Sequence, residues 1–564
     1  MGEVTPSPRR GLLALFLGAF CFFGLFAHGY VENTDAEITM HAARAWWLRG
    51  DPGLLRDGPD ASTPERWIAT QIHEPGPLDF GLVGRNGRAY VWFPIGHQAL
   101  MVPAVALGEL CGRVFPAAEA RLFAQKNGDE LFGRFFWCRF FVSWLPIPFA
   151  AGSVVLVFLL ARVLGASARA ALITTAFATL TTALWPGSSE TMSDVPGAFF
   201  LLACALEVFT WRADVLASRP RSKTLLWAGV AGGLAVMVRY PHALAVIVLA
   251  VGAAVVALRA RRVRDLAHLA LGGAPALVAL CAANWLRFGS LTETGYSAGA
   301  TPEWWSYPPW LGIPLILLAP GKGILWFSVG LWPALAQWCR RATWVHRWPL
   351  VVALGVLVLP IVVSGHTAGW AGGQCWSARY FTPGVVLVVA VGLALGRPWE
   401  RRPRTLLAVF ALGTLVSLGG VLTPYRGDRN LAHAATAAAY PEQAAQDVDL
   451  LPLIYDFEPR FSPIHSHWTY AWLSVRGRLA AGGSANTTEP LFGVRVPPPL
   501  GDTLRPGREE DVGLRHWWWC YGAAFFGWSP WLCLPLLLGA VAGLGTAWQK
   551  SAAETPKATG VASR

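Results

Sequence analysis

The sequence predicts an all-α polytopic membrane protein with about twelve transmembrane helices, interfacial helices in its first outer loop and a small outer domain near the C-terminus. Hydrophobic residues make up 54% of the 564 residues, and charged residues only 14%. The mean hydropathy is +0.41, whereas an ordinary soluble domain carries about 25% charged residues. Apolar segments long enough to cross hydrocarbon recur along the chain. They lie at 11–29, 140–161, 168–185, 192–211, 224–239, 241–258, 266–286, 320–338, 347–365, 380–396, 405–423 and 524–547.

Basic residues give the chain a net charge of +12, and they are concentrated in short connections between the apolar segments. These connections lie at 9–10, 219–223, 259–264, 340–341 and 401–404. Cytoplasmic loops of membrane proteins carry such an excess of Lys and Arg, so these connections are predicted to be cytoplasmic. The charge therefore reports membrane topology, and no nucleic-acid partner is predicted.

The predicted topology divides the chain into four parts. They are a transmembrane domain at 1–423, an extracytoplasmic domain at 424–523, a last transmembrane helix at 524–547 and a cytoplasmic tail at 548–564. The first outer loop, 30–139, contains the apolar segment 95–113. Counting back from the basic loop at 219–223 places the chain on both sides of this segment outside, so it is predicted to lie in the membrane interface. The domain at 424–523 is rich in Pro and Gly, which predicts short strands and turns.

Ionisable residues are almost absent from the centres of the predicted spans and gather at their outer ends. Asp35 and Glu37 follow the first span, while Arg239, Lys322 and Arg379 lie at the outer ends of later spans. Acids and bases could therefore converge on one outer site. Transporters usually place ionisable residues inside the membrane, so this distribution favours an enzyme over a lipid or sugar transporter or flippase.

Neither the cysteines nor the histidines form a pattern that predicts a metal site. The nine cysteines show no paired spacing, and several fall in apolar segments, so they are interpreted as packing residues. His73 and His97 each lack a second ligand at a fixed spacing. No cofactor is predicted, and the requirement for a metal stays open.

Seven motifs follow one another at the predicted outer face. They are DAEITMHAARAWWLRGDPGL (35–54), NGRAYVWFPIGHQALMVPAVALG (86–108), TTALWPGSSETMSDVPGAFFLL (181–202), VMVRYPHALAV (236–246), NWLRFGSLTETGY (284–296), APGKGILWFS (319–328) and WAGGQCWSARYFTP (370–383). In this order they resemble the outer loops of the GT-C glycosyltransferase superfamily, in the branch of the protein O-mannosyltransferases and the bacterial lipid-carrier-dependent transferases. The resemblance covers about residues 11–424, and the ordered set is more specific than any single motif.

The resemblance implies a membrane glycosyltransferase that moves a sugar from a polyprenyl-phosphate donor to an outer acceptor, with inversion, at the inner (plasma) membrane. It implies an acid of the first loop as general base, and we assign Asp35 as the base with Glu37 assisting. A carboxylate can take the proton of an acceptor hydroxyl as an oxocarbenium-like centre develops. The protein O-mannosyltransferases tend to carry adjacent Asp and Glu here, whereas Ala36 separates the two acids in this chain.

Cations are needed where the lipid phosphate leaves, and Arg239, Lys322 and Arg379 are predicted to supply them. The predicted substrate-binding residues are His97, Tyr240, Trp370 and Tyr380. The sugar and the acceptor are not predicted, and membrane lipids are the other expected partners.

Simpler interpretations stand beside these assignments. Asp35 could be the N-cap of a helix at 36–48, a role compatible with catalysis. Arg239 and Lys322 could extend to phospholipid headgroups, while Glu190 and Asp194 are interpreted mainly as caps of the fourth span. In a noncatalytic scaffold the outer charges would be scattered. In an enzyme, Asp35 should share an outer cavity with at least one of the three predicted phosphate-binding cations.

Overall fold

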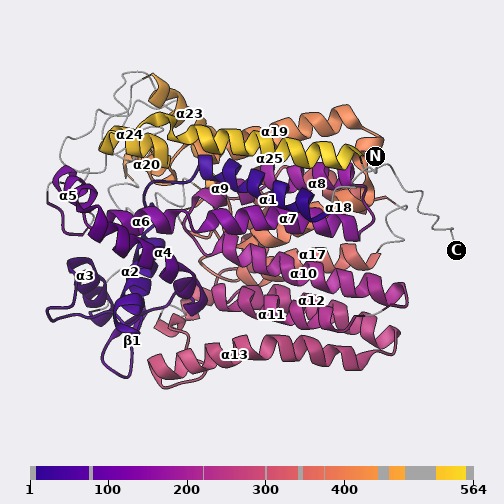
Figure 1. The fold of residues 1–564 in the computed structure, drawn as a ribbon, viewed down its shortest axis with the longest axis horizontal. Coiled ribbons are helices and arrows are strands. Elements are labelled where there is room, and N and C mark those ends of the chain that lie inside the picture. The colour runs from indigo at the N-terminus through magenta and orange to yellow at the C-terminus, as the bar shows by residue number, and fades with distance from the viewer. Residues whose placement is uncertain are drawn as a thin grey trace, which may run out of the picture.

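Long antiparallel helices fill one half of the molecule, and short helices with a small hairpin fill the other (Figure 1). The computed structural model describes residues 8–74, 81–126, 128–131, 133–219, 221–298, 302–340, 347–373, 375–442, 456–476 and 516–553. The half with α2 to α6 is called the short-helix end. The opposite end of the long helices, which carries the arginine-rich connections at 217–222, 260–265 and 397–402, is called the basic end.

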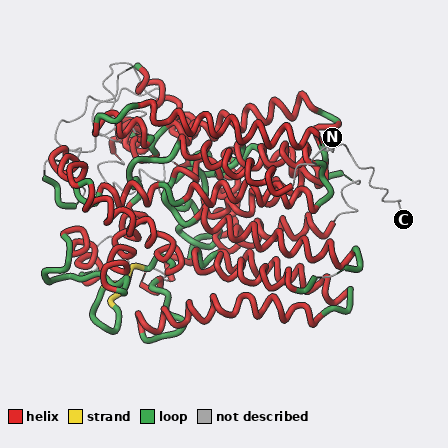
Figure 2. The backbone as a smooth tube through the Cα atoms, in the orientation of Figure 1, coloured by secondary structure: helices red, strands yellow, loops and turns green. Residues whose placement is uncertain are grey.

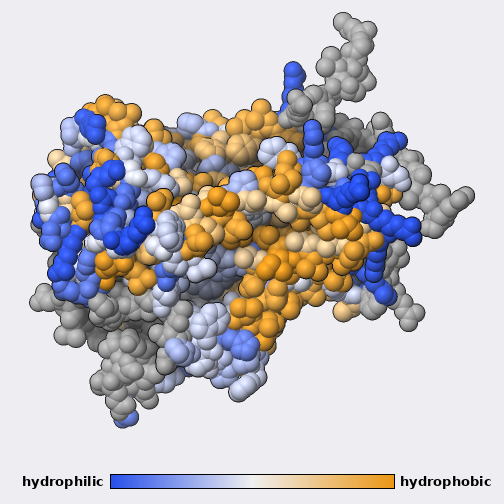
Figure 3. Space-filling view, turned by 90° about the horizontal axis from the view of Figure 1, so that it is seen from below, coloured by the Kyte–Doolittle hydropathy of each residue, from blue (hydrophilic) through white to orange (hydrophobic). Residues whose placement is uncertain are grey.

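The long helices account for the predicted class. They are α1 (Pro8–Leu25), α7 (Pro146–Val163), α8 (Ala168–Leu180), α10 (Asp194–Leu216), α11 (Lys223–Val238), α12 (His242–Arg259), α13 (Leu266–Phe288), α17 (Arg347–Ser364), α18 (Thr382–Gly396), α19 (Pro403–Leu422) and α25 (Leu534–Ala553). Of the described helices, seven are long and apolar enough to cross a membrane, or eight if one bent pair counts as a single span. Figure 3 shows an apolar band between two hydrophilic ends. The all-α polytopic membrane class is thus confirmed, while the number of twelve spans stays a prediction.

The segment predicted as a span at 320–338 is not one helix. It follows α14 (Pro309–Leu318) and is divided into α15 (Ile324–Phe327) and α16 (Leu331–Trp338). Gly330 lies at this division, and a Cβ there would meet the Thr181 Oγ1 at only 2.2 Å. Hydropathy reports apolar length alone, and it does not register that Pro and Gly interrupt a helix.

The short-helix end has a core of its own. Its helices are α2 (Thr34–Arg49), α3 (Thr63–His73), α4 (Ile95–Val114), α5 (Pro116–Gln125) and α6 (Phe136–Ser143). The antiparallel strands β1 (Gly81–Val83) and β2 (Ala89–Val91) pair Gly81 with Val91, and Figure 2 shows strands only at this end among the described residues. Apolar side chains of α2, α3 and β2, among them Ile38, Ile68 and Val91, pack together. The predicted interfacial segment at 95–113 is α4, which meets α5 at a bend of 91°.

The region predicted as an extracytoplasmic domain of short strands is helical in its described parts. It contains α20 (Tyr425–Ala439), α23 (Pro463–Val475) and α24 (Trp518–Phe526). The prediction of strands is wrong for these parts. The alanine-rich stretch 431–439 explains why, since Ala has the highest helix propensity of all residues. The stretches 443–455 and 477–515 lie outside the described residues, so the domain boundaries stay predictions.

The first and last long helices, α1 and α25, pack against each other through glycines. A Cβ at Gly543 would lie 2.6 Å from the Gly18 Cα, and one at Gly18 would lie 2.6 Å from the Leu544 N. Glycines at such crossings let two helix backbones approach closely. At the short-helix end α1 is also joined to α24, where the Trp518 indole N–H donates to the Gly24 carbonyl at 2.9 Å. The described chain therefore begins and ends side by side.

Candidate active site

The start of α2 turns Asp35 and Glu37 in different directions. The Asn33 side chain accepts a hydrogen bond from the Asp35 N–H at 2.7 Å and caps the helix, which begins at Thr34. Side chains on an α-helix are about 100° apart per residue, so two positions give roughly 200°. Asn33 is thus the N-cap, and the alternative in which Asp35 caps a helix at 36–48 is wrong.

Glu37 belongs to a buried ion pair with α6. The Arg139 Nε donates to both carboxylate oxygens, at 3.0 and 3.1 Å, and the His41 Nε2 lies 3.2 Å from Oε1. Burial alone would raise the pKa of Glu37, but the Arg139 charge and these hydrogen bonds lower it to about 2. The carboxylate is 12% exposed, and it is committed to Arg139 rather than to solvent.

Asp194 connects two arginines, and one of these reaches Asp35. Asp194 Oδ1 lies 3.0 Å from Arg239 Nη1, and Oδ2 lies 3.5 Å from Arg379 Nη1. Arg379 Nη2 in turn lies 3.4 Å from Asp35 Oδ2. The first three side chains are between 7 and 11% exposed, whereas that of Asp35 is 41% exposed. These four residues, called the arginine cluster, lead from a buried interior to an accessible carboxylate.

Turns at the short-helix end hold both guanidiniums in place. Arg239 ends α11 with an extended backbone, φ −154°, where the chain turns into α12. Arg379 begins the 3₁₀ helix η5 (Arg379–Phe381), directly before α18. The turn before it contains Gly372 and Gly373 at φ of 79° and 76°, a conformation that favours glycine. A Cβ at Gly372 would lie at an ordinary contact distance of 3.4 Å from the Arg379 Cγ, so it is the positive φ that makes this turn depend on its glycines.

Two further predicted residues face the same arginines. The Tyr380 ring centroid lies 4.6 Å from the Arg239 Cζ and 5.6 Å from the Arg379 Cζ. An aromatic face stabilises a cation at such distances. His97 is buried in the first turn of α4 and interacts electrostatically with both arginines and with Asp194.

An aromatic group borders the arginine cluster. Tyr296 lies in the 3₁₀ helix η2 (Tyr296–Ala298) and interacts electrostatically with Asp35 and Arg239. Its ring stacks on Trp92 with centroids 5.6 Å apart and 2° between the planes, and it packs edge-on against Tyr240 at 5.9 Å. Flat apolar faces next to a carboxylate suit the ring of a sugar, because the ring has apolar and hydroxyl-bearing surfaces.

Several hydrogen-bond donors in and beside the arginine cluster are unused. The Nε atoms of Arg239 and Arg379 and the hydroxyl of Tyr240 are buried and have no hydrogen-bond partner within the described ranges. A guanidinium carries five N–H donors, and its planar fork matches the geometry of phosphate. Chemically, the arrangement can bind an anionic group beside an accessible carboxylate.

Lys322 lies next to this arrangement, but its ammonium is fully used. Its Nζ donates to the carbonyls of Gly373 and Cys375 at 2.8 and 2.5 Å and to the Tyr425 hydroxyl at 3.0 Å. An ammonium has three donors, and the side chain is 2% exposed. The Lys322 carbonyl also accepts from the Ala378 N–H at 3.0 Å. Lys322 thus holds the turn that ends in Arg379.

Trp370 and Glu190 lie in and against the same turn. The Trp370 ring is 2% exposed and packs near Phe457, with centroids 6.3 Å apart. Glu190 accepts a hydrogen bond from the Trp376 N–H at 3.0 Å. Burial raises the pKa of Glu190 to about 7, although this hydrogen bond and the Arg379 charge act in the opposite direction.

Sequence reasoning missed the role of Asp194 and Tyr296. Asp194 was interpreted as a helix cap, yet its carboxylate is the common partner of Arg239 and Arg379. A signal was present, because buried cations need an acid near them and few acids lie at the outer span ends. Tyr296 is the last residue of the 284–296 motif, and the sequence does not indicate that it contacts Trp92 and Tyr240. Across the described ranges, no group of three or more His, Cys, Asp or Glu is arranged to hold a metal ion.

Comparisons with known proteins show a partial match to one family of glycosyltransferases. Residues 111–283 match the family model of the dolichyl-phosphate-mannose-protein mannosyltransferases. No curated protein matches significantly. Among solved structures, ArnT from Cupriavidus metallidurans bound to undecaprenyl phosphate is similar at 13% identity and a TM-score of 0.44, over 95% of this chain and 77% of that one. The apo Archaeoglobus fulgidus oligosaccharyltransferase is similar at 12% identity and a TM-score of 0.39, over 89% and 63%. The family match covers less than half of the chain, so it shows similarity to these mannosyltransferases over residues 111–283.

Proposed function

We propose that the protein transfers a sugar from a polyprenyl-phosphate donor to an acceptor hydroxyl at the extracytoplasmic face of the inner membrane. The observation that carries this proposal is the arginine cluster, in which two buried guanidiniums with unused donors lead to the accessible carboxylate of Asp35. The partial match to the dolichyl-phosphate-mannose-protein mannosyltransferases, whose name gives a sugar on dolichyl phosphate, supports a donor of this chemical class. The basic end is then cytoplasmic, as the positive-inside rule requires.

Arg239 and Arg379 bind the donor phosphate in this proposal. The phosphate of the donor is a diester with one negative charge, and the polyprenyl phosphate that leaves carries up to two. Fixed guanidiniums therefore stabilise the leaving group more than the bound donor, which is what accelerates the bond-breaking step. Asp194 keeps both cations oriented when the phosphate is absent. Lys322 acts through the turn that carries Arg379.

Asp35 acts as the general base. It takes the proton of the acceptor hydroxyl while the hydroxyl oxygen bonds to the anomeric carbon and the bond from that carbon to the phosphate oxygen breaks. Attack from the face opposite the phosphate gives inversion. Tyr240, Tyr296 and Trp92 border the donor sugar, and His97 and Tyr380 flank the phosphate. Glu37, committed to Arg139, supports α2 rather than the proton transfer.

The test is a transfer assay with Asp35→Asn. Purified protein in liposomes is given a panel of polyprenyl-phosphate sugars with membrane and envelope extracts as acceptors, and products are identified by mass spectrometry. We expect Asp35→Asn to lower the transfer rate by roughly 10²- to 10⁴-fold, the usual contribution of a general base. The change keeps the size of the side chain, so donor binding should persist.

Asp60→Asn is the matched control, because Asp60 is an exposed acid of the same region. Its rate should equal that of the wild type. Transfer at the wild-type rate by correctly folded Asp35→Asn would refute the assignment of the base. Movement of intact lipid-linked sugar across the liposome membrane, without any transfer, would instead support a transporter.

A further inference from the structure

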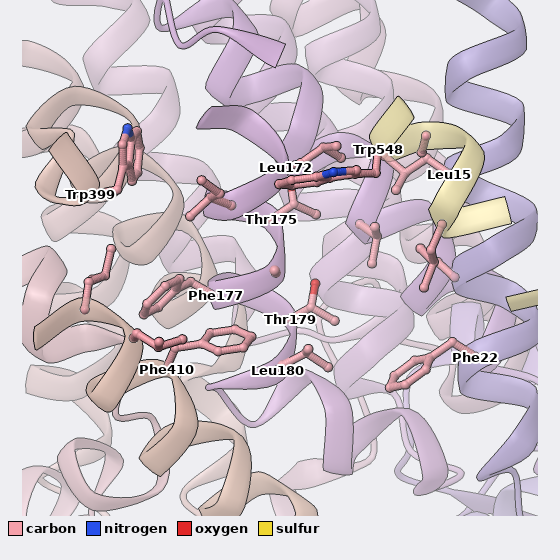
Figure 4. A pocket seen from close by; sticks show the side chains of 18 of the residues that line it. Leu15, Phe22, Leu172, Thr175, Phe177, Thr179, Leu180, Trp399, Phe410 and Trp548 are labelled. Carbon is pink, nitrogen blue, oxygen red and sulfur yellow. The ribbon is translucent and has the colours of Figure 1, made fainter. Parts of the chain in front are cut away.

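A cavity of about 490 Å³ lies among the long helices, away from the candidate active site. Its walls come from α1, α8, α19 and α25, with Phe22, Leu172, Phe177 and Phe410 among the lining side chains (Figure 4). Its volume falls within the range of about 300–1,000 Å³ typical of small-molecule sites. The lining is almost wholly apolar, so the cavity suits a hydrocarbon chain.

The cavity opens sideways, toward the surface that meets lipid. Leu407 of α19 lines it and is 67% exposed, and Trp548 of α25 lines it and is 44% exposed. Trp399, in the 3₁₀ helix η6 (Pro398–Glu400), also lines it near the basic end. Tryptophan is enriched where hydrocarbon meets the headgroups, so this end of the cavity lies at the depth of a membrane interface.

Basic residues gather at this same end of all four wall helices. Arg10 lies in the first turn of α1, Arg169 in that of α8, Arg402 is the N-cap of α19, and Lys550 lies in the last turn of α25. The Arg169 guanidinium lies 5.5 Å from the centroid of Trp548, a cavity-lining residue. Within the described ranges, none of these four residues forms an ion pair with an acid. Basic side chains without a paired acid therefore lie at this end of the wall helices, and one of them lies against a residue that lines the cavity.

We propose that this cavity binds one anionic phospholipid from the leaflet at the basic end. An acyl chain lies between α8 and α19, and the phosphate lies against Arg169 and Arg402. Anionic headgroups are attracted to basic side chains at the membrane surface, and this attraction supplies selectivity that an apolar cavity alone lacks.

The position of the headgroup separates this lipid from the sugar donor. The arginine cluster lies where α10 begins and α11 ends, at the short-helix end, whereas the mouth of the cavity lies at the basic end, where α8 and α19 begin (Figure 1). A donor phosphate held by Arg239 and Arg379 would place its charge at the opposite end of the long helices. The inference therefore does not depend on the proposed transfer reaction.

The experiment is native mass spectrometry of the full chain in mild detergent, after incubation with equal amounts of phosphatidylglycerol and phosphatidylcholine. The wild type should retain one phosphatidylglycerol in preference to phosphatidylcholine. The double variant Arg169→Glu/Arg402→Glu changes only exposed side chains and should lower the occupancy of phosphatidylglycerol at least about tenfold. Ala176→Trp, which fills the cavity from α8, should lower the retention of any phospholipid by a similar factor.

Two matched controls are available. Arg259→Glu reverses one exposed charge at the basic end of α12, and Val278→Trp adds the same bulk to a side chain of α13 that is 66% exposed. Both should bind phosphatidylglycerol as the wild type does. Equal retention of the two lipids, or unchanged binding by the folded charge variant, would overturn the proposal. Displacement of the phospholipid by polyprenyl phosphate would show that the cavity holds the donor chain instead.

Discussion

At the scale of single residues, the helical period explains why two neighbouring acids have different partners. Asp35 and Glu37 both lie in the first turn of α2, yet one meets Arg379 and the other Arg139. Both acids are evident in the sequence, and so is Asn33, a residue type that commonly caps the start of a helix. Placing the cap at Asp35 hid the fact that two positions along a helix lead to nearly opposite faces.

A stability measurement separates the role of Glu37 from that of Asp35. Glu37→Gln leaves the Arg139 cation buried without its carboxylate, and breaking such a pair costs about 3–5 kcal/mol. We expect a lower unfolding midpoint in denaturant titrations but near wild-type transfer per folded molecule. Glu130→Gln is the control, because Glu130 pairs with Arg134 at an exposed site and exposed pairs contribute little. A lost rate without lost stability would contradict this assignment.

The same ion pair sets a dependence on pH. The pKa of Glu37 in the folded protein, about 2, lies below its ordinary value of 4.5. A carboxyl whose pKa is lowered by folding stabilises the fold above the ordinary pKa, and this contribution is lost as the pH falls toward the folded value. The stability difference between wild type and Glu37→Gln should therefore be constant above about pH 5 and shrink below pH 4.5.

At the scale of elements, the turn at 370–381 shows what a motif can and cannot reveal. The W-x-G-G pattern and the Arg-Tyr that follows it pointed to Arg379 and Tyr380, and the structure places both beside Arg239. The anchor of the turn was not visible, because Lys322 reaches it from a distant segment through backbone carbonyls. Every residue has a backbone carbonyl, so the sequence does not show which carbonyls accept a hydrogen bond from Lys322.

Replacing Lys322 should loosen this turn. Lys322→Met leaves two carbonyls and the Tyr425 hydroxyl without a donor, and each unsatisfied group costs about 1–3 kcal/mol. We expect faster hydrogen exchange over 370–381 and a raised KM for the donor, because Arg379 loses its fixed position. Tyr425→Phe removes one hydrogen bond of the three and should show a smaller change. A raised KM with unchanged exchange would instead identify Lys322 as a direct ligand of the phosphate.

At the scale of the whole molecule, composition and the positions of the charges were sufficient to predict the fold class. They were not sufficient to predict which helices pack against each other. Hydropathy identified the long helices, and the arginine-rich connections do lie at one end of them (Figure 1). Which helices touch depends on side-chain detail, because nearly every helix is apolar. The pairing of α1 with α25 depends on Gly18 and Gly543. The chain contains 59 glycines, and the sequence does not show which of them lie at a helix crossing.

A pair of substitutions in α25 tests this contact. Gly543→Val puts a Cβ 2.6 Å from backbone atoms of Gly18, so the two helices must separate. Forcing bulk into a packed site typically costs about 1–3 kcal/mol, which should appear as a lower midpoint of thermal unfolding. Gly545→Val is the control, because a Cβ there meets nothing within 4 Å. Equal midpoints for the two variants would show that the close crossing is not needed.

The contact between α1 and α25 also has a consequence for the order of events during biosynthesis. α1 leaves the ribosome well before its partner α25 is made. At roughly 5–20 residues per second, α1 waits on the order of a minute before Gly543 can cover Gly18. During that time α1 needs a temporary neighbour in the translocation machinery or among lipids. A ribosome that stalls before α25 would release a chain whose first helix lacks its partner, which gives quality-control proteases a signal of incompleteness.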